Sequence, residues 1–167
     1  MAMTLSREMR PKLAALNLVL NALAVEPAIE TVDDRKRVQK AVYLAQVFAG
    51  VDLGYRYSWY KKGPYSPKLT RDYYSLAEAL ELGEKPSDVK LQDADVGKLQ
   101  AIREMFTVPP GVDLQAEDWL ELLASLDFLK RVSKKVDADI DRVIQGEKES
   151  LHQYVAVGKD FLQQHGG

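Results

Sequence analysis

The feature that most constrains the fold is one short stretch, residues 55–67, which interrupts a chain of largely helical pattern. It reads Tyr-Arg-Tyr-Ser-Trp-Tyr-Lys-Lys-Gly-Pro-Tyr-Ser-Pro. Tyr55, Tyr57 and Trp59 recur at every second position, and this period is typical of a strand with one packed face. The Gly-Pro pair that follows favours a turn. The stretch therefore predicts a small β element around residues 55–60.

Helical patterns flank this stretch on both sides. Ser66 and Pro67 predict a helix start. The Ser66 hydroxyl can accept a hydrogen bond from a backbone N–H of the first turn, and the backbone N–H that Pro67 lacks has no intrahelical acceptor at this position. Before the stretch, we expect a helix that is capped by Asp33 or Asp34 and ends at Gly50. Its later half is apolar almost all round, which predicts burial on two sides and a central place in the fold.

Most of the remaining chain also has the apolar periodicity of amphipathic helices. We expect these helices to begin at Ser6, at Asp93, at about Ala116, and at a capping box formed by Ser150 and Gln153. The pattern from Ala116 runs to Gly146, and a break near Lys134 stays open. Residues 88–92 are a candidate partner strand for the aromatic stretch.

The length of 167 residues is enough for one domain with a sizeable core. Together with the helical patterns, it predicts a mainly α fold: a single-domain bundle of about six or seven helices, residues 1–167, with a small β element. Pro109-Pro110-Gly111 stops one helix firmly, so a sub-boundary is possible near residues 107–114.

Composition excludes several classes of site. The chain has no cysteine, so it cannot carry a disulfide framework, a thiol nucleophile or a cysteine-ligated zinc ion. It has no run of 18 or more apolar residues and no signal-peptide pattern at its start, so we expect a cytoplasmic protein without a membrane span.

Charge is distributed unevenly along the chain. From Asp33 to Asp72 there are nine basic and four acidic residues, a net charge of +5, whereas the rest of the chain carries −7. A basic segment in an acidic chain indicates either a negatively charged partner or packing against the protein's own acidic part. The sequence leaves both interpretations open.

No pattern of catalytic or metal-binding residues is visible. The two histidines, His152 and His165, are too far apart for a helical metal pair, and no phosphate loop, dinucleotide motif or nucleophile elbow occurs. Residues 137–141 resemble the start of a calcium loop but lack its Gly and final Glu. We therefore predict no catalytic, cofactor-binding or metal-binding residues, and an enzyme of unknown type is only a third hypothesis.

Two groups of residues resemble a known family. Residues 37–45 read Arg-Val-Gln-Lys-Ala-Val-Tyr-Leu-Ala, and Trp59 and the Gly-Pro-Tyr-Ser-Pro of residues 63–67 follow them. This pattern resembles the Panacea domain family, which includes SocA-like antitoxins, and is closer still to uncharacterised YwgA-like bacterial and archaeal proteins. The resemblance spans residues 33–80. It implies a small, mostly helical domain that binds another protein, which for antitoxins is a toxin.

The first functional hypothesis is a protein-interaction module whose aromatic and basic Gly-Pro loop binds a partner protein, with a toxin encoded nearby as the candidate. In this interpretation Trp59 anchors the loop, and Lys61, Lys62 and Tyr65 face the partner. A purely structural role for the loop is the alternative. The candidate partner-binding residues are Lys36, Lys40, Tyr43, Trp59, Tyr60, Lys61, Lys62, Gly63, Pro64, Tyr65, Lys68 and Arg71.

The second hypothesis is a winged-helix-like regulator that binds nucleic acid. The helix after Pro67 would then enter the groove with Lys68, Arg71 and Ser75, and the loop would serve as a wing. Residues 35–40 would contact the phosphates. The connection from Gly50 to the next helix is longer than the turn of a helix-turn-helix motif, which argues against this hypothesis.

Overall fold

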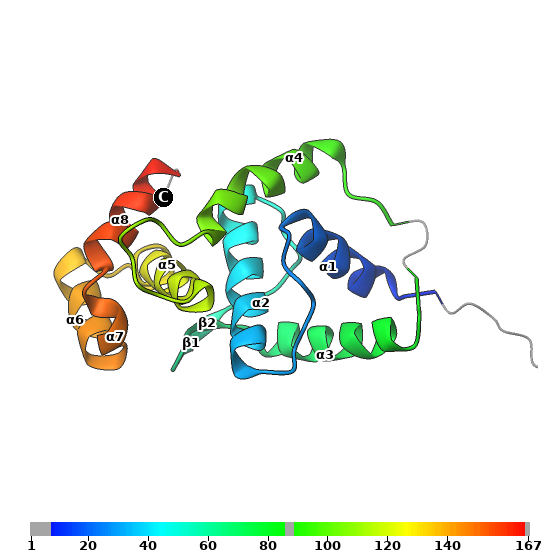
Figure 1. Ribbon diagram of the computed structural model, residues 1–167, viewed down its shortest axis with the longest axis horizontal. Helices are drawn as coiled ribbons and strands as arrows, with labels where there is room; N and C mark the ends of the chain where they lie inside the picture. The colour runs from blue at the N-terminus through cyan, green and yellow to red at the C-terminus, as the bar shows by residue number, and fades with distance from the viewer. Residues whose placement is uncertain (1–7, 86–88, 166–167) are drawn as a thin grey trace, which may run out of the picture.

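The computed structural model describes residues 8–85 and 89–165. Within these ranges the fold is mainly α, with one small hairpin, as predicted (Figure 1). The elements are α1 (Pro11–Ala22), α2 (Val32–Leu44) with a π-helical turn η1 (Ala45–Ala49), β1 (Ser58–Tyr60), β2 (Gly63–Tyr65), α3 (Pro67–Glu81), α4 (Asp93–Ala101) with a 3-10 turn η2 (Ile102–Phe106), α5 (Ala116–Arg131), α6 (Asp137–Glu147), α7 (Glu149–His152) and α8 (Val155–Gln164).

Helix α2 occupies the centre of the molecule. Helices α1 and α3 pack on one side of it, and α5 and strand β2 pack on the other (Figure 1). Residues 38–45 are all buried, which confirms the predicted burial on two sides. Gly50 has a φ of 67° and ends this helical segment in the left-handed region, as predicted.

The start of α2 differs from the prediction. Thr31, not Asp33 or Asp34, is the N-cap. Its hydroxyl accepts a hydrogen bond from the Asp34 backbone N–H at 3.0 Å, and the Asp34 carboxylate accepts one from the Thr31 backbone N–H at 3.2 Å. Thr31 is thus the N-cap of a capping box, and Asp34 is its N3 residue.

The β element is an antiparallel hairpin. Ser58 pairs with Tyr65 and Tyr60 with Gly63, so the turn lies at Lys61 and Lys62. The strand is shorter than the predicted 55–60, because the side chain of Gln46 binds the backbone N–H and C=O of Tyr55 in place of a strand partner. The partner strand is residues 63–65, and the prediction of residues 88–92 as partner was wrong.

The next helix starts as the sequence predicts. The Ser66 hydroxyl accepts a hydrogen bond from the backbone N–H of Leu69 at 3.2 Å, and Pro67 is the first helical residue. Asp93 is the first residue of α4 rather than its cap, which is Gln92. The predicted start at Ser6 lies outside the described residues.

Helix α5 forms the second centre of the core, and α6 and α8 pack beside it (Figure 1). The chain does break near Lys134, which has a φ of 57°, so α5 and α6 are separate helices. The capping box at Ser150 and Gln153 was wrong, since α7 includes Ser150 and α8 begins at Val155. These breaks give eight α-helices in the described ranges, against six or seven predicted.

Residues 107–115 connect η2 to α5. One continuous cluster of buried apolar side chains draws residues from both sides of this connection, including Leu99 and Met105 before it and Trp119 after it. The Trp119 indole N–H donates to the backbone carbonyl of Met105 at 3.0 Å and ties the two sides together.

Candidate functional site

Three of the predicted partner-binding residues lie inside the molecule. Lys36, Lys40 and Tyr43 follow one face of α2, and they are only 8%, 1% and 3% exposed. Expecting them on an interaction surface was wrong, because this face packs against α5. The acidic residues of α5 supply partners for Lys36 and Tyr43, so part of the basic segment packs against the protein's own acidic part.

A chain of ion pairs runs through this interface. The Lys36 ammonium lies 2.6 Å from Asp118 Oδ1 and 3.0 Å from Glu121 Oε1, and Glu121 Oε2 lies 2.8 Å from the Lys148 ammonium. Burial by itself raises the pKa of Glu121, but the hydrogen bonds and charges of Lys148 and Lys36 outweigh it and hold that pKa below its usual value. Glu121 is therefore ionised and neutralises two lysines.

Tyr43 reaches the other end of the same interface. Its hydroxyl donates to Asp127 Oδ2 at 2.7 Å, and Arg131 binds the same carboxylate at 3.0 Å. Burial and the Asp127 carboxylate raise the pKa of Tyr43 well above its ordinary value, so the hydroxyl keeps its proton and remains a donor.

Lys40 differs from its neighbours because it has no carboxylate partner. Its ammonium donates to the backbone carbonyl of Pro64 at 2.7 Å. Desolvation lowers its pKa from 10.5 to about 7; the Glu121 charge opposes this shift, and the Lys148, Lys36 and Lys62 charges reinforce it. Lys40 is thus a buried amine that titrates near neutral pH.

Strand β2 of the hairpin fits tightly against α5. Gly63 has a φ of 91°, and a Cβ atom at this position would lie 2.6 Å from the Ser125 hydroxyl oxygen. Gly63 and Pro64 are both buried, so they are not partner-contacting residues, contrary to the prediction. In the described part of the chain, the buried Ser125 hydroxyl has no hydrogen-bond partner.

Trp59 anchors the hairpin from its other strand, as the sequence interpretation expected. Its ring stacks on Phe128 with centroids 6.0 Å apart, and its indole N–H donates to Glu147 Oε2 at 2.8 Å. The Lys148 ammonium lies 5.4 Å from the Trp59 ring centroid and also donates to the backbone carbonyl of Lys61. Trp59 is half-buried, so it supports the turn by packing and offers little exposed surface to a partner.

The tip of the hairpin is exposed. Tyr60 is 47% exposed, Lys61 and Lys62 are exposed, and Tyr65 is half-buried with its ring centroid 4.8 Å from that of Tyr60. We call these four residues the hairpin surface. They are the predicted candidates that the structure brings together on the outside of the molecule.

Lys68 and Arg71 are exposed on α3 but belong to a different region. The ammonium of Lys12 on α1 lies beside Lys68 and lowers the pKa of Lys68, and Lys12 itself pairs with Asp72 at 3.2 Å. These residues therefore lie at the junction of α1 and α3. They lie apart from the hairpin surface, because the helical rotation of α3 separates them from Thr70, whose hydroxyl forms a hydrogen bond with the Tyr65 hydroxyl of β2.

A groove opens between α2, the hairpin turn and α3. We call it the basic groove, and its principal lining residues are Arg35, Lys40, Lys62, Tyr65, Tyr73 and Tyr74, with Lys36 and Gln39 beside them. Gln39 joins α2 to the start of α3, because its amide N–H donates to the Ser66 carbonyl at 2.9 Å and to the Thr70 hydroxyl at 3.0 Å.

Sequence reasoning missed Tyr73 and Tyr74 as site residues, and it named Arg35 and Gln39 only within residues 35–40, the phosphate contacts of the second hypothesis. A signal was present, since Arg35, Gln39 and their neighbours form an i, i+4 stripe on α2 that contains no acidic residue. What the sequence did not contain was the placement of this stripe opposite the tyrosines of α3.

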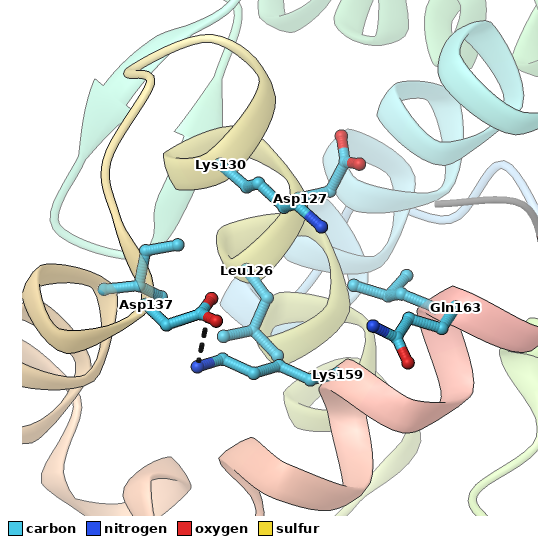
Figure 2. A pocket seen from close by; sticks show the side chains of 8 residues that line it. Leu126, Asp127, Lys130, Asp137, Lys159 and Gln163 are labelled. Atoms are coloured by element: carbon cyan, nitrogen blue, oxygen red, sulfur yellow. Dashed lines mark ion pairs between the residues drawn. The ribbon is translucent and has the colours of Figure 1, made fainter.

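A second pocket lies between α5, α6 and α8. Figure 2 shows Lys130 and Asp127 from α5, and Asp137 and Lys159 facing each other across it. The Lys159 ammonium and Asp137 Oδ1 are 3.6 Å apart. This pocket has as many acidic as basic residues, so it has no surplus charge to select a ligand.

The structure brings no metal site together in residues 8–85 and 89–165, since they contain no cluster of three or more His, Cys, Asp or Glu residues suited to an ion. None of the helices in these ranges has the length and apolar character needed to cross a bilayer.

No protein-family model, curated protein or solved structure matches the chain. The resemblance to Panacea domains thus remains a prediction from residues 33–80.

Proposed function

We propose that the protein is a protein-interaction module whose hairpin surface binds an acidic region of a partner protein. The observation that carries this proposal is an exposed aromatic and basic turn fixed to the core by buried contacts. Tyr60, Lys61, Lys62 and Tyr65 form the contact surface, and Lys40, Trp59 and Lys148 hold it.

The aromatic part of the hairpin surface supports binding to a protein. Tyrosine is enriched at interface positions that contribute most of the binding energy, because it buries a large ring and keeps one hydrogen-bonding group. Tyr60 has nearly half of its surface open to solvent and packs on Tyr65. The pair offers a two-ring contact at the tip of the hairpin.

The contacts beneath the turn lower the cost of binding. Lys40 holds the carbonyl of Pro64, Lys148 holds the carbonyl of Lys61, and Trp59 is fixed between Phe128 and Glu147. A loop already held in one conformation loses little conformational entropy on association. The turn is therefore suited to present its side chains without refolding.

The charge of the turn favours an acidic partner. No carboxylate lies within 4.0 Å of the Lys61 or Lys62 ammonium group among residues 8–85 and 89–165. Exposed cations of this kind increase the rate of encounter with negative surfaces and select against basic ones. The resemblance to Panacea antitoxins adds a candidate, a toxin encoded by the adjacent gene.

The test is a binding measurement with the product of the adjacent gene, by surface plasmon resonance. The triple variant Tyr60→Ala, Lys61→Glu, Lys62→Glu should weaken binding by about two orders of magnitude, since it removes a ring and reverses two charges. Lys98→Glu on α4 is the matched control, because α4 lies away from the hairpin, at the opposite end of α2 (Figure 1). Equal affinity of the triple variant and the control would refute the proposal.

Duplex DNA is the comparison ligand in the same measurement. A nucleic-acid-binding regulator would lose affinity through Lys68→Glu and Arg71→Glu, and its binding would weaken steeply with added salt. If these two changes on α3 abolish DNA binding and the hairpin variant does not, the regulator replaces the interaction module as the function.

A further inference from the structure

The basic groove has a charge imbalance that the hairpin surface does not explain. Four cationic side chains line it, namely Arg35, Lys36 and Lys40 from α2 and Lys62 from the hairpin turn. None of the residues that line it is acidic. A concave site lined by charges of one sign concentrates ions of the opposite sign.

Three of these four cations lack a carboxylate partner. Lys36 is paired with Asp118 and Glu121, but none of the acidic side chains in residues 8–85 and 89–165 lies within 4.0 Å of Arg35, Lys40 or Lys62. Arg35 uses Nη1 to donate to the backbone carbonyls of Ile29 and Glu30. The other guanidinium N–H groups of Arg35 make no hydrogen bond within the described chain. The groove therefore has surplus donors and surplus positive charge.

Three tyrosines form much of the remaining wall of the groove, beside Val32, Gln39 and Thr70. Tyr65 comes from strand β2, and Tyr73 and Tyr74 come from α3, with their ring centroids 5.2 Å apart. Tyr74 is 49% exposed, so its ring is accessible at the rim. Rings of this kind pack favourably against another flat ring.

We propose that the basic groove binds a small aromatic phosphate monoester, with the phosphate between Arg35 and Lys62, beside the buried Lys40, and the ring against Tyr65 and Tyr74. A phosphate monoester has nearly two negative charges and three strong acceptor oxygens, which match several donors from separate elements better than one carboxylate does. This site goes beyond the proposed function, because it needs no partner protein.

Among the groove residues, Lys40 is the one whose charged form a bound phosphate stabilises most. It is 1% exposed, and the backbone carbonyl of Pro64 is its hydrogen-bond acceptor. The charges that face it are Glu121 from α5, Lys148, Lys36 and Lys62, so cations outnumber the one anion. A bound dianion supplies the missing counter-charge and favours the protonated amine.

The experiment is isothermal titration of the full chain with phenyl phosphate, benzoate and inorganic phosphate. Benzoate keeps the ring with a single charge, and inorganic phosphate keeps the charge without the ring. Phenyl phosphate should bind about tenfold more tightly than either, because only it uses both parts of the groove. Absence of saturable phenyl phosphate binding, or equal affinity for benzoate, would overturn the proposal.

Variants locate the binding on the groove. Lys62→Ala should weaken phenyl phosphate about tenfold, and Tyr74→Ala should weaken phenyl phosphate while leaving inorganic phosphate within about twofold. Both positions are exposed, so these variants test the site without removing the buried Lys40 from the core. Lys68→Ala on α3 is the control, and a loss as large as that of Lys62→Ala would show general charge attraction and refute the site.

Two further changes separate this site from the proposed function. Tyr60→Ala with Lys61→Glu alters the hairpin surface outside the groove, so it should weaken the partner protein and not phenyl phosphate. Tyr74→Ala should weaken phenyl phosphate binding and leave binding of the partner protein unchanged. If phenyl phosphate binding fails while the partner still binds, only the groove proposal falls.

Discussion

The Lys40 ammonium donates a hydrogen bond of 2.7 Å to the backbone carbonyl of Pro64, across 24 positions of the chain. This bond joins the central helix α2 to the second strand of the hairpin. Its donor is almost fully buried and has no carboxylate partner in the described residues. The conformation of the hairpin and the protonation of Lys40 are therefore linked.

The first prediction concerns the pH dependence of stability. The pKa of Lys40 is about 7 in the folded protein and close to 10.5 in the unfolded chain, so between these values the unfolded chain binds more protons. The free energy of unfolding should then rise with pH over this window. Relative to Lys40→Met, the wild-type protein should gain about 2 kcal/mol from pH 7 to pH 9.

Urea unfolding at pH 7, 8 and 9 measures this difference. Lys98→Met on α4 serves as the control, because Lys98 is exposed and the difference from wild type should stay constant with pH. A constant difference for Lys40→Met as well would show that Lys40 keeps its charge in the folded protein.

The second prediction concerns Gly63. A Cβ atom here meets the Ser125 hydroxyl at 2.6 Å in a left-handed conformation, so Gly63→Ala should lower the free energy of unfolding by about 2–4 kcal/mol. Gly54→Ala is the control, because Gly54 also has a positive φ, 81°, but nothing lies within 4 Å of its Cβ position. Its cost should be only about 1 kcal/mol.

A double-mutant cycle identifies the clash as the cause. Ser125→Ala removes the hydroxyl that Gly63→Ala would meet, and that hydroxyl has no hydrogen-bond partner within the described chain. The double variant should therefore recover part of the loss, about 1 kcal/mol or more. Purely additive effects would mean that backbone strain alone explains Gly63.

The third prediction concerns Glu121, which neutralises Lys36 and Lys148. Glu121→Gln leaves Lys148 without a carboxylate partner in the described chain, and it should cost about 3–5 kcal/mol in urea unfolding. Glu78→Gln on α3 is exposed and should change stability by less than about 0.5 kcal/mol. A similarly small effect at Glu121 would mean that the buried ion pairs contribute little net stability.

The fourth prediction concerns how Trp59 holds the hairpin. Trp59→Phe keeps an aromatic ring against Phe128 but removes the donor to Glu147, so stability should fall by about 1 kcal/mol. Trp59→Ala removes the stack as well and should cost more, about 2–3 kcal/mol. Equal effects of the two changes, measured by thermal unfolding, would show that the hydrogen bond and not the stack holds the strand.

The sequence alone determined the parts of the fold that depend on near neighbours in the chain. The Ser66 cap, the stop at Gly50 and the alternating faces of residues 55–60 needed only local hydrogen bonds, backbone angles and spacing. The central place of α2 also followed, since a helix that is apolar on nearly all sides has to be covered on more than one.

Only the tertiary structure decided which basic residues face solvent. Lys36 and Lys40 are the same residue type as the exposed Lys61 and Lys62, yet the packing of α2 against α5 buries them. The carboxylates that pair with Lys36 lie 82 and 85 positions away. Desolvation and charge pairing depend on neighbours in space, so helical periodicity could not place these lysines inside the molecule or bring α2 and α3 together as a groove.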